Sequence, residues 1–492
     1  MFDETQERPY VLSMINTIRS SSLTSFAQYY SSLTGDAWEF TFAQLLMITS
    51  QNLGIYIDIP TYPRVTAYPN LFIILIAPPG VHHKSTIINR TKNITQKITE
   101  LVQNEDYVKS ITNLQLAGSM EGFMERLTKG DKIDLYNDEF GRVLAASARG
   151  TYETGLLEIL NNAYYKKGTA SLRREIKSIG ADGERREGSK NRDLIVPDGK
   201  YVTFFGAIHE NEMTEEMYRV GIIRRSIIVY LSYESVVTDP IVYDRESNEL
   251  ANAIEEAIIK VMAEARMNLV KWSYQPTYEL KMDENNGYDY IQQHKHLPIN
   301  FEYSDEAIDF LKELYTTAMK NAKQEKRQLY PSESVELITR IAINIMLWDA
   351  MRKEKYSNLV LTKENLIEAK NYMEKIVENY IKAISTVEDK DVDERSKKVY
   401  NYIMKKCENF PYFINQGDVM NAIGQKWENY QRENAIVHAI EENKIARFEI
   451  TYLKKRTGYI LCPYARVDDV ITILEKMVAE KKILNFKEVR KR

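Results

Sequence analysis

A lysine followed by two hydroxyl residues stands soon after a strongly apolar run, an arrangement typical of a phosphate-binding loop. The run Leu71–Ala77 is followed by Pro78, Pro79, Gly80, Val81, His82, His83, Lys84, Ser85 and Thr86. A strand, a turn that uses glycine and a helix start would point backbone N–H groups at phosphates, with the lysine on their oxygens and a hydroxyl on Mg²⁺. We therefore expect ATP and Mg²⁺ as cofactors, with nucleotide contacts from Gly80, His83, Lys84, Ser85 and Thr86, and Ser85 also on the metal.

This loop departs from the regular pattern Gly-Pro-Pro-Gly-x-Gly-Lys-Ser/Thr. Ala77 replaces the first glycine, one residue is inserted, and His82 and His83 stand where the last glycine is usual. A side chain there could crowd the phosphates, whereas a protonated histidine could add positive charge to them. Taken alone, the loop is equally compatible with a structural strand, turn and helix.

Two adjacent carboxylates end a second apolar run roughly fifty residues further on. Asp138 and Glu139 follow the segment Lys132–Asn137. At such a strand end the first carboxylate holds Mg²⁺ through water and the second polarises the attacking water. We expect Asp138 to be the metal ligand and Glu139 the general base. An ordinary acidic strand end is the alternative.

Two further positions could complete a site that hydrolyses a nucleotide. A third apolar run, Tyr201–Ile208, ends in His209, where a side chain could sense the γ-phosphate. Arg224 and Arg225 precede a fourth run, Ser226–Leu231, and an arginine here could stabilise transition-state charge in a neighbouring subunit. The alternatives are a polar strand end and a solvated arginine pair.

The four apolar runs alternate with longer helical stretches, which indicates a parallel sheet with crossover helices. Helical periodicity around it predicts a helical N-terminal region at 1–68, an α/β core at 69–240 and a helical, lid-like region at 241–388. Thr362 offers an N-cap for one of the later helices. A charged linker at 388–394 leads into a separate C-terminal module at 389–492.

The C-terminal module shows the element order of a winged helix. Three helices and then two β-like runs are expected, at Lys397–Lys406, Gln416–Ile423, Asn429–Glu442, Ile445–Leu453 and Gly458–Leu461. The tip between the two runs is basic, with Lys454, Lys455 and Arg456. The third helix would read a DNA groove and the tip would contact phosphate. A helical protein-interaction cap is the alternative.

In this order the elements resemble a family of helicase-like P-loop ATPases of phages, plasmids and integrated elements, often found beside or fused to primases. The likeness covers residues from about 10 to 380 and is carried by Pro69–Ser85, Asp138–Arg142, Gly206–Ala207, Gly221–Arg225 and Arg340–Ala342. It implies a RecA/AAA+-type core, a homo-oligomeric ring such as a hexamer, and Arg225 rather than Arg224 as the arginine acting in trans. The histidines in the loop depart from the family's usual glycine, which bears on turnover more than on fold. The C-terminal module lies outside the resemblance.

A glycine-rich, locally basic stretch lies between the second and third apolar runs. It extends from Gly180 to Arg192, and its basic residues are Arg185, Arg186, Lys190 and Arg192. In a ring-shaped helicase a hairpin at this place would face the central channel and follow the phosphate backbone of DNA. The alternative is a flexible surface loop.

Composition limits the classes of function. The chain is 44% hydrophobic and 28% charged, as in ordinary globular proteins, and its net charge of −4 excludes a uniformly basic coat, so any DNA contact must come from local patches. Cys407 and Cys462 cannot make a disulfide framework or a zinc site, which fits a reducing cytoplasm. No signal peptide or membrane span is expected. His294 and His296 are read as part of a polar loop without a metal site.

The leading hypothesis is an ATP-dependent DNA translocase or replicative helicase of a mobile genetic element, acting on single-stranded or forked DNA. The rival is a non-catalytic DNA-binding or replication-initiator protein whose loop has decayed into a nucleotide-sensing or structural role. The irregular loop favours the rival, whereas the intact Asp138, Glu139 and Arg225 favour the leading hypothesis.

Overall fold

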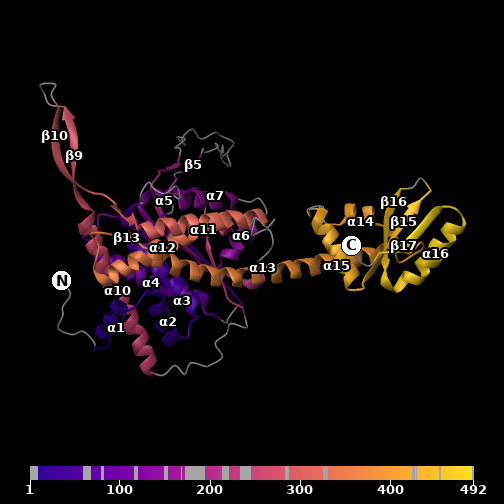
Figure 1. Ribbon diagram of the computed structural model, residues 1–492, viewed down its shortest axis with the longest axis horizontal. Helices are drawn as coiled ribbons and strands as arrows, with labels where there is room; N and C mark the ends of the chain where they lie inside the picture. The colour runs from indigo at the N-terminus through magenta and orange to yellow at the C-terminus, as the bar shows by residue number, and fades with distance from the viewer. Residues whose placement is uncertain are drawn as a thin grey trace, which may run out of the picture. The chain divides into compact units, whose positions relative to one another are not determined.

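The computed structural model divides the chain into two compact units, Met1–Ala383 and Ile384–Arg492 (Figure 1). The described part of the chain is residues 9–58, 68–78, 82–115, 120–148, 153–167, 169–171, 194–212, 221–232, 245–282, 288–324, 331–423, 427, 429–453 and 456–489.

A five-stranded parallel sheet forms the centre of the first unit. In sheet order its strands are β3 (Ser110–Gln115), β4 (Lys132–Asn137), β7 (Tyr201–His209), β2 (Phe72–Ala77) and β8 (Ile227–Tyr230). Every neighbouring pair is parallel, and β2 is buried at every position, as a strand covered on both faces requires. The predicted parallel sheet with flanking helices is confirmed. The sheet also contains β3, which the sequence does not predict because its residues are mostly polar.

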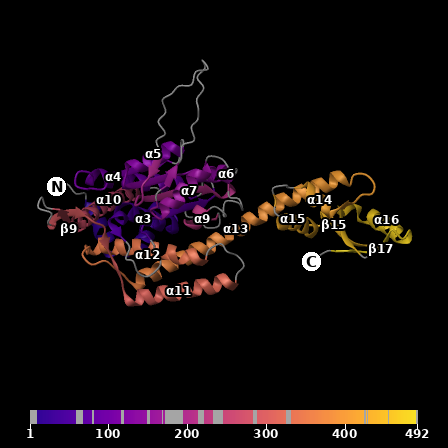
Figure 2. The ribbon, with the colours of Figure 1, turned by 90° about the horizontal axis from the view of Figure 1, so that it is seen from above.

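The helices that precede the sheet strands in the sequence and those that follow them share one hydrophobic core. Helix α3 (Trp38–Leu53) is buried from Glu39 to Leu53 and contacts α2 (Leu23–Thr34), α4 (Lys84–Val102), α10 (Arg245–Ser273) and α12 (Pro331–Lys353). Figure 2 shows α3 between α4 and α12. The hydrophobic cluster that includes β2 therefore extends from Val11 in the first helix to Ile376.

The remaining elements of this unit are shorter or lie around the sheet. Its other helices are α1 (Pro9–Ser20), α5 (Met120–Lys129), α6 (Phe140–Ala148), α7 (Glu153–Tyr164), α9 (Gly221–Arg224), α11 (Asp305–Gln324) and the first part of α13 (Lys363–Lys406). Two short parallel pairs are β1 (Ile57–Asp58) with β11 (Ile299–Asn300), and β12 (Glu302–Tyr303) with β13 (Val360–Leu361). Two antiparallel pairs are β5 (Thr169–Ser171) with β6 (Leu194–Val196), and β9 (Tyr274–Met282) with β10 (Tyr288–His296), which extends away from the helices (Figure 1).

A buried arginine fixes α12 to the segment that enters β2. Arg340 is fully buried, and its Nη1 donates to the carbonyl oxygens of Tyr68 at 3.1 Å and Asn70 at 2.9 Å. Its Nη2 donates to Glu336 Oε1 at 2.9 Å and the Tyr164 carbonyl at 3.3 Å, and the guanidinium lies 3.7 Å from the centroid of the Tyr164 ring. One side chain thereby holds α12, the end of α7 and the start of β2 together.

The second unit contains the three helices and two strands expected there, and three further elements, β14, α16 and β17. Its elements are the end of α13, β14 (Ile414–Asn415), α14 (Gln416–Ala422), α15 (Asn429–Glu441), β15 (Ile445–Tyr452), β16 (Thr457–Pro463), α16 (Val467–Ala479) and β17 (Ile483–Glu488). They form an antiparallel sheet in the order β14-β16-β15-β17. Because β17 pairs with β15, the β15–β16 hairpin is the middle of a sheet and not a free two-stranded wing.

The expected linker at 388–394 is helical instead. Helix α13 runs without a break from Lys363 to Lys406. The segment contains neither glycine nor proline, and its charged residues are compatible with a helix, so charge alone does not end one.

Replacing Arg340 with alanine should destabilise the first unit strongly. The change leaves the carboxylate of Glu336 and several buried carbonyl groups without their donor, which typically costs about 3–5 kcal/mol. Arg352→Ala on the same helix is the control, because Arg352 makes a partly exposed pair with Asp349, worth about 1 kcal/mol or less. Urea unfolding followed by tryptophan fluorescence measures both changes, and equal losses would contradict the role given to Arg340.

Candidate active site

Four of the predicted residues lie at one edge of the sheet. The chain leaves parallel strands at the same edge. Lys84 follows β2, Asp138 and Glu139 follow β4, and His209 ends β7 beside Ala77 of β2. The fold therefore brings these groups to one side, where ligands bind in open parallel sheets.

Lys84 is buried at this edge and is held by the end of β2. Its Nζ donates to the carbonyl oxygens of Ala77 at 2.7 Å and Pro78 at 3.2 Å. Burial lowers the pKa of Lys84 to about 8, and the nearby carboxylates of Glu212 and Glu210 oppose that shift. Phosphate oxygens would be stronger partners for this ammonium group than two neutral carbonyl groups.

The start of α4 is open to an anion. No side chain caps this helix, and the side chains of Ser85 and Thr86 in its first turn are exposed. The first backbone N–H groups of a helix have no partner within it, and the positive end of the helix dipole lies there. The α4 start therefore fits a phosphate, as the sequence analysis expects, while Gly80 lies outside the described residues.

His83 takes a left-handed backbone conformation, which favours glycine. Its φ of 48° and ψ of 32° are left-handed, and its side chain is exposed. Glycine adopts this region without steric cost, whereas a side chain is strained there. The histidine therefore replaces the missing glycine by accepting strain.

His82 does not add charge to a phosphate. Its ring is buried, with Nε2 3.0 Å from the Ser232 carbonyl oxygen, and lies in a T-shaped contact with the Phe40 ring. Burial lowers the pKa of His82 and so favours the neutral imidazole. The expectation of a protonated histidine on the phosphates does not hold for this residue, because its ring nitrogen bonds to the chain after β8.

The two carboxylates after β4 are exposed. Glu139 accepts a hydrogen bond from Arg142 Nη1 at 2.7 Å, and its backbone N–H donates to Asn137 Oδ1 at 2.9 Å. An exposed ion pair of this kind contributes only about 0.2–1 kcal/mol. Glu139 can therefore leave Arg142 at small cost, and Asp138 beside it presents its carboxylate to solvent.

Two carboxylates that the sequence analysis does not single out lie at the same edge. Glu212 Oε2 accepts from the backbone N–H of His209 at 3.3 Å, and Glu210 accepts from the Tyr230 hydroxyl at 2.8 Å. Both raise the pKa of Lys84, so their charges act on the lysine. Their signal in the sequence was their place directly after the third apolar run.

One ring nitrogen of His209 is buried at this edge. It is Nδ1, which has no hydrogen-bond partner among the residues that the structure describes. The backbone of His209 lies beside Ala77, the last residue of β2.

Arg225 lies at the opposite edge of the sheet from Lys84. It precedes β8, whose four residues span about 13 Å at ~3.3 Å each. Its Nη1 donates to the Gly221 carbonyl at 2.9 Å and Asn161 Oδ1 at 3.3 Å, and its guanidinium faces the Tyr165 ring. Arg225 is therefore separated from Lys84 by the length of this strand.

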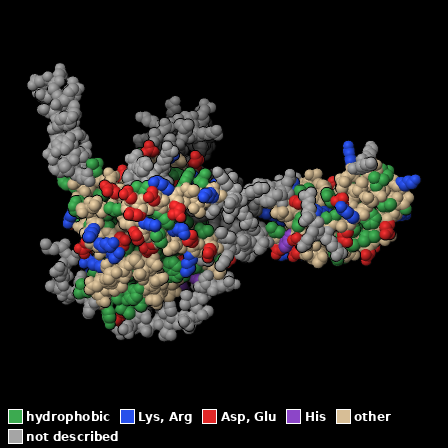
Figure 3. Space-filling model, in the orientation of Figure 1, with side chains coloured by type: hydrophobic (Ala, Val, Ile, Leu, Met, Phe, Trp, Pro, Cys, Tyr) green, Lys and Arg blue, Asp and Glu red, His purple; other side chains and the backbone are tan. Residues whose placement is uncertain are grey.

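The residues expected to bind DNA lie mostly outside the described part of the chain. Arg185, Arg186, Lys190, Arg192, Lys454 and Lys455 are in this position, and only the exposed Arg456 is described. The first four fall between β5 and β6, which pair antiparallel as the two sides of a hairpin do. Acidic and basic side chains are interspersed over the described surface seen in Figure 3, so no uniform basic coat appears on that face.

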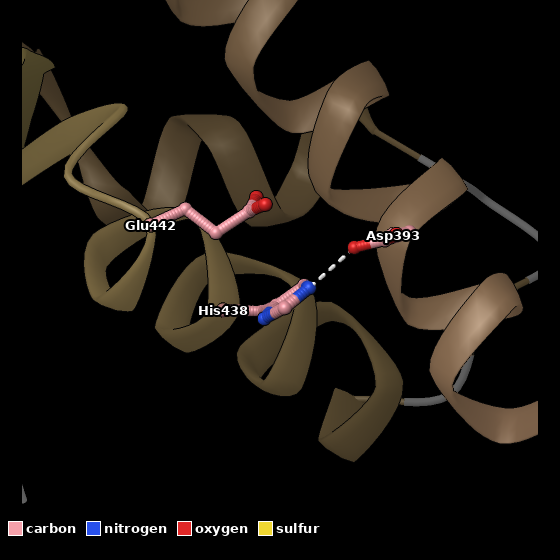
Figure 4. A group of neighbouring side chains, drawn as sticks. All are labelled: Asp393, His438 and Glu442. Carbon is pink, nitrogen blue, oxygen red and sulfur yellow. Dashed lines mark hydrogen bonds and ion pairs between the residues drawn. The ribbon is translucent and has the colours of Figure 1, made fainter. Parts of the chain in front are cut away.

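A histidine and two carboxylates gather in the second unit without forming a convincing metal site. His438 Nε2 lies 2.6 Å from Asp393 Oδ1, and these groups and Glu442 lie close together (Figure 4). Glu442 is already paired with Lys444 Nζ at 2.6 Å. The contacts are those of a hydrogen bond between α15 and α13 and an ion pair between two residues just before β15.

No protein-family model and no curated protein matches the chain, and none of its described helices is long and apolar enough to cross a membrane. Among solved structures, a full-length MCM homolog from Methanopyrus kandleri is similar at 11% identity with a TM-score of 0.36, over 76% of this chain and 63% of that chain. The NrS-1 C-terminal region is similar at 9% identity with a TM-score of 0.23, over 72% of this chain and 71% of that chain. The Aeropyrum pernix ORC1 protein in complex with DNA is similar at 10% identity with a TM-score of 0.21, over 89% and 93%. The chain thus spans less than two thirds of the MCM homolog, and likenesses this low carry no argument about function.

Replacing His83 with glycine should preserve the site. Glycine adopts the left-handed conformation freely, so relief of strain offsets the added freedom of the unfolded chain, and stability should change by about 1 kcal/mol or less. His83→Val is the matched control, because a β-branched residue is disfavoured at this φ and should weaken both stability and ATP binding. Thermal unfolding and titration with a fluorescent ATP analogue measure both. Loss of binding in His83→Gly would instead show that the imidazole contacts the nucleotide.

Nucleotide binding should weaken as the pH rises above about 8, the pKa of Lys84. Above that pH the free protein holds a neutral lysine, and binding of phosphates to the charged form must take up a proton. The Kd of a non-hydrolysable ATP analogue should then rise by up to about tenfold per pH unit. Lys84→Arg, which stays charged, should flatten this rise. A Kd in the parent protein that is constant from pH 7 to 9.5 would contradict the assignment.

Proposed function

We propose that the chain is an ATP-hydrolysing motor of the helicase class that acts on DNA in replication. The observation that carries this proposal is the buried Lys84 at the uncapped start of α4, beside the strand ends that bear Asp138, Glu139 and His209. An N-terminal helix turn with a lysine is suited to the triphosphate, and the exposed carboxylates are suited to a metal ion and water.

In this proposal each residue at the edge has one task. Lys84 neutralises phosphate oxygens, while backbone groups from His83 to Thr86 bind them. Ser85 and Asp138 hold Mg²⁺, because hydroxyl and carboxylate oxygens are ligands that this ion prefers. Glu139 polarises the attacking water after leaving Arg142. His209 senses the γ-phosphate, which its buried Nδ1 supports, because this atom has no hydrogen-bond partner in the described part of the chain.

We propose further that copies of the chain assemble into a ring in which Arg225 acts on the neighbouring subunit. Its place at the far edge of the sheet from Lys84 supports a role outside its own site. Among the described residues its partners are neutral, namely Asn161, Tyr165 and the Gly221 carbonyl, so its charge remains available to an incoming phosphate. In such a ring we expect the basic residues from Arg185 to Arg192, between β5 and β6 in the chain, to face the channel.

The rival function is a DNA-binding initiator that keeps the nucleotide site without turnover. The observations that favour it are the strained His83 in place of glycine and the pairing of Glu139 with Arg142. Under this reading the second unit would carry the DNA contact through its β15–β16 hairpin, with Arg456 directly before β16.

Lys84→Ala should abolish ATP binding, and Glu139→Gln should retain it while lowering turnover about 10²–10⁴-fold, since a general base typically contributes that much. The measurements are nucleotide titration and steady-state ATP hydrolysis, each with and without single-stranded DNA. Lys97→Ala, an exposed lysine on the same helix, is the control for charge removal.

The outcomes separate the two functions. Turnover in the parent protein that Glu139→Gln suppresses supports the motor. The initiator is supported if the parent protein binds ATP, Lys84→Ala does not, and neither the parent nor any variant hydrolyses ATP. Normal binding by Lys84→Ala would reject both.

A further inference from the structure

Exposed aromatic side chains gather at the base of the β9–β10 hairpin. Trp272 is 51% exposed, Tyr274 53% and Tyr107 41%. The Tyr107 ring stacks on the His296 ring with centroids 3.9 Å apart and planes 16° from parallel, and the Tyr274 ring lies 5.1 Å from His296. We call these three rings, together with Trp272 two residues before Tyr274 in the chain, the aromatic platform. The platform lies in the first unit, and it shares no residue with the candidate active site.

The platform arises from pairing that the sequence analysis does not foresee. His296 was expected in a polar loop, but it ends β10 and faces Tyr274 at the start of β9. Ser273 between Trp272 and Tyr274 places its Oγ 3.1 Å from His296 Nδ1. The backbone N–H of Leu297 donates to the Ser273 carbonyl at 2.8 Å. The end of α10 and the end of β10 are therefore fixed to each other.

A buried polar cluster fixes the position of Tyr107. The Tyr107 ring makes a T-shaped contact with the ring of Tyr56, which is fully buried. The Tyr56 hydroxyl donates to Asp106 Oδ2 and accepts from Arg266 Nε at 2.9 Å. Asp106 Oδ1 also accepts from the backbone N–H of Val108, so both neighbours of Tyr107 in the chain are held. Rings fixed in this way lose little freedom when a flat group stacks on them.

Two lysines adjoin the platform in the chain without an ion-pair partner among the described residues. Lys271 precedes Trp272 at the end of α10, Lys109 lies two residues after Tyr107, and both are exposed. Asp106, the acidic residue next to Tyr107, is already neutralised by Arg266. Aromatic faces with free cations beside them are suited to bases and phosphates together.

We propose that the aromatic platform binds single-stranded DNA. The bases of the DNA would stack on the exposed rings, at a site that does not include the basic residues Arg185 to Arg192. A single strand fits better than a duplex, because the faces of paired bases are covered by their neighbours. The choice of DNA as the partner rests on the proposed function. The contact itself does not depend on ATP, so the two can fail separately.

Trp272→Ala and Tyr274→Ala should each weaken binding of a fluorescein-labelled dT20 strand by roughly five- to a hundredfold, the range for loss of one stacked base. Binding of a duplex of the same length should change less than twofold. Binding is measured with the full chain in the absence of nucleotide. The measurement is repeated with each change combined with Lys84→Ala, so that it does not depend on a functional ATP site. Tyr315→Ala on α11, which is 50% exposed, is the matched control and should bind dT20 like the parent.

Two further readouts separate stacking from a structural effect. Addition of dT20 should quench tryptophan fluorescence in the parent, and Trp272→Phe should lose this quenching while keeping most of the affinity. Trp272→Ala should leave the slope of log affinity against log salt unchanged, whereas Lys271→Ala should reduce it by about 0.7, the value for one phosphate contact on a single strand. Parent-like affinity of Trp272→Ala and Tyr274→Ala for dT20, or equal losses on the duplex, would overturn the proposal.

Discussion

Strand β2 must be covered on both faces, and most of the first unit depends on that requirement. Its six residues are fully apolar and buried, and its neighbours β7 and β8 satisfy its backbone groups. Helices from both ends of the unit supply the cover. Arg340 fixes the segment before β2, and Lys84 bonds to the carbonyl groups after it. The start of β2 and the position of Lys84 after it are thus tied to a strand that cannot shift without exposing the core.

The parts of the fold that could be predicted are those in which local pattern and tertiary role agree. β2, β4, β7 and β8 are apolar runs because both of their faces are buried. β3 is mostly polar and belongs to the sheet through its pairing with β4, which no local pattern reveals. The prediction of a linker at 388–394 has another cause of error. The charged residues there are as compatible with a helix as with a loop, and the segment is part of α13.

The candidate site divides in the same way. Spacing along the chain was enough to place Lys84, Asp138, Glu139 and His209 at one edge of the sheet, because each ends an apolar strand or follows one in the chain. The conformation of His83 and the burial of His82 depend on contacts with distant residues, so the sequence allowed opposite readings of both. Glu210 and Glu212 act on Lys84 because β7 adjoins β2 in the sheet, although some 130 residues separate the two strands along the chain.

The shared core has a consequence for how the protein is made. Helix α3, buried along nearly its whole length, ends at Leu53, and helix α12, which covers part of it, begins at Pro331. At about 5–20 residues per second, a ribosome needs roughly 15–55 s to pass from one to the other. During that interval the emerging N-terminal helices present an apolar surface that their own chain cannot yet cover. The first unit therefore finishes folding late in synthesis. Until α12 has been synthesised, the exposed apolar surface of the N-terminal helices is suited to binding by a chaperone.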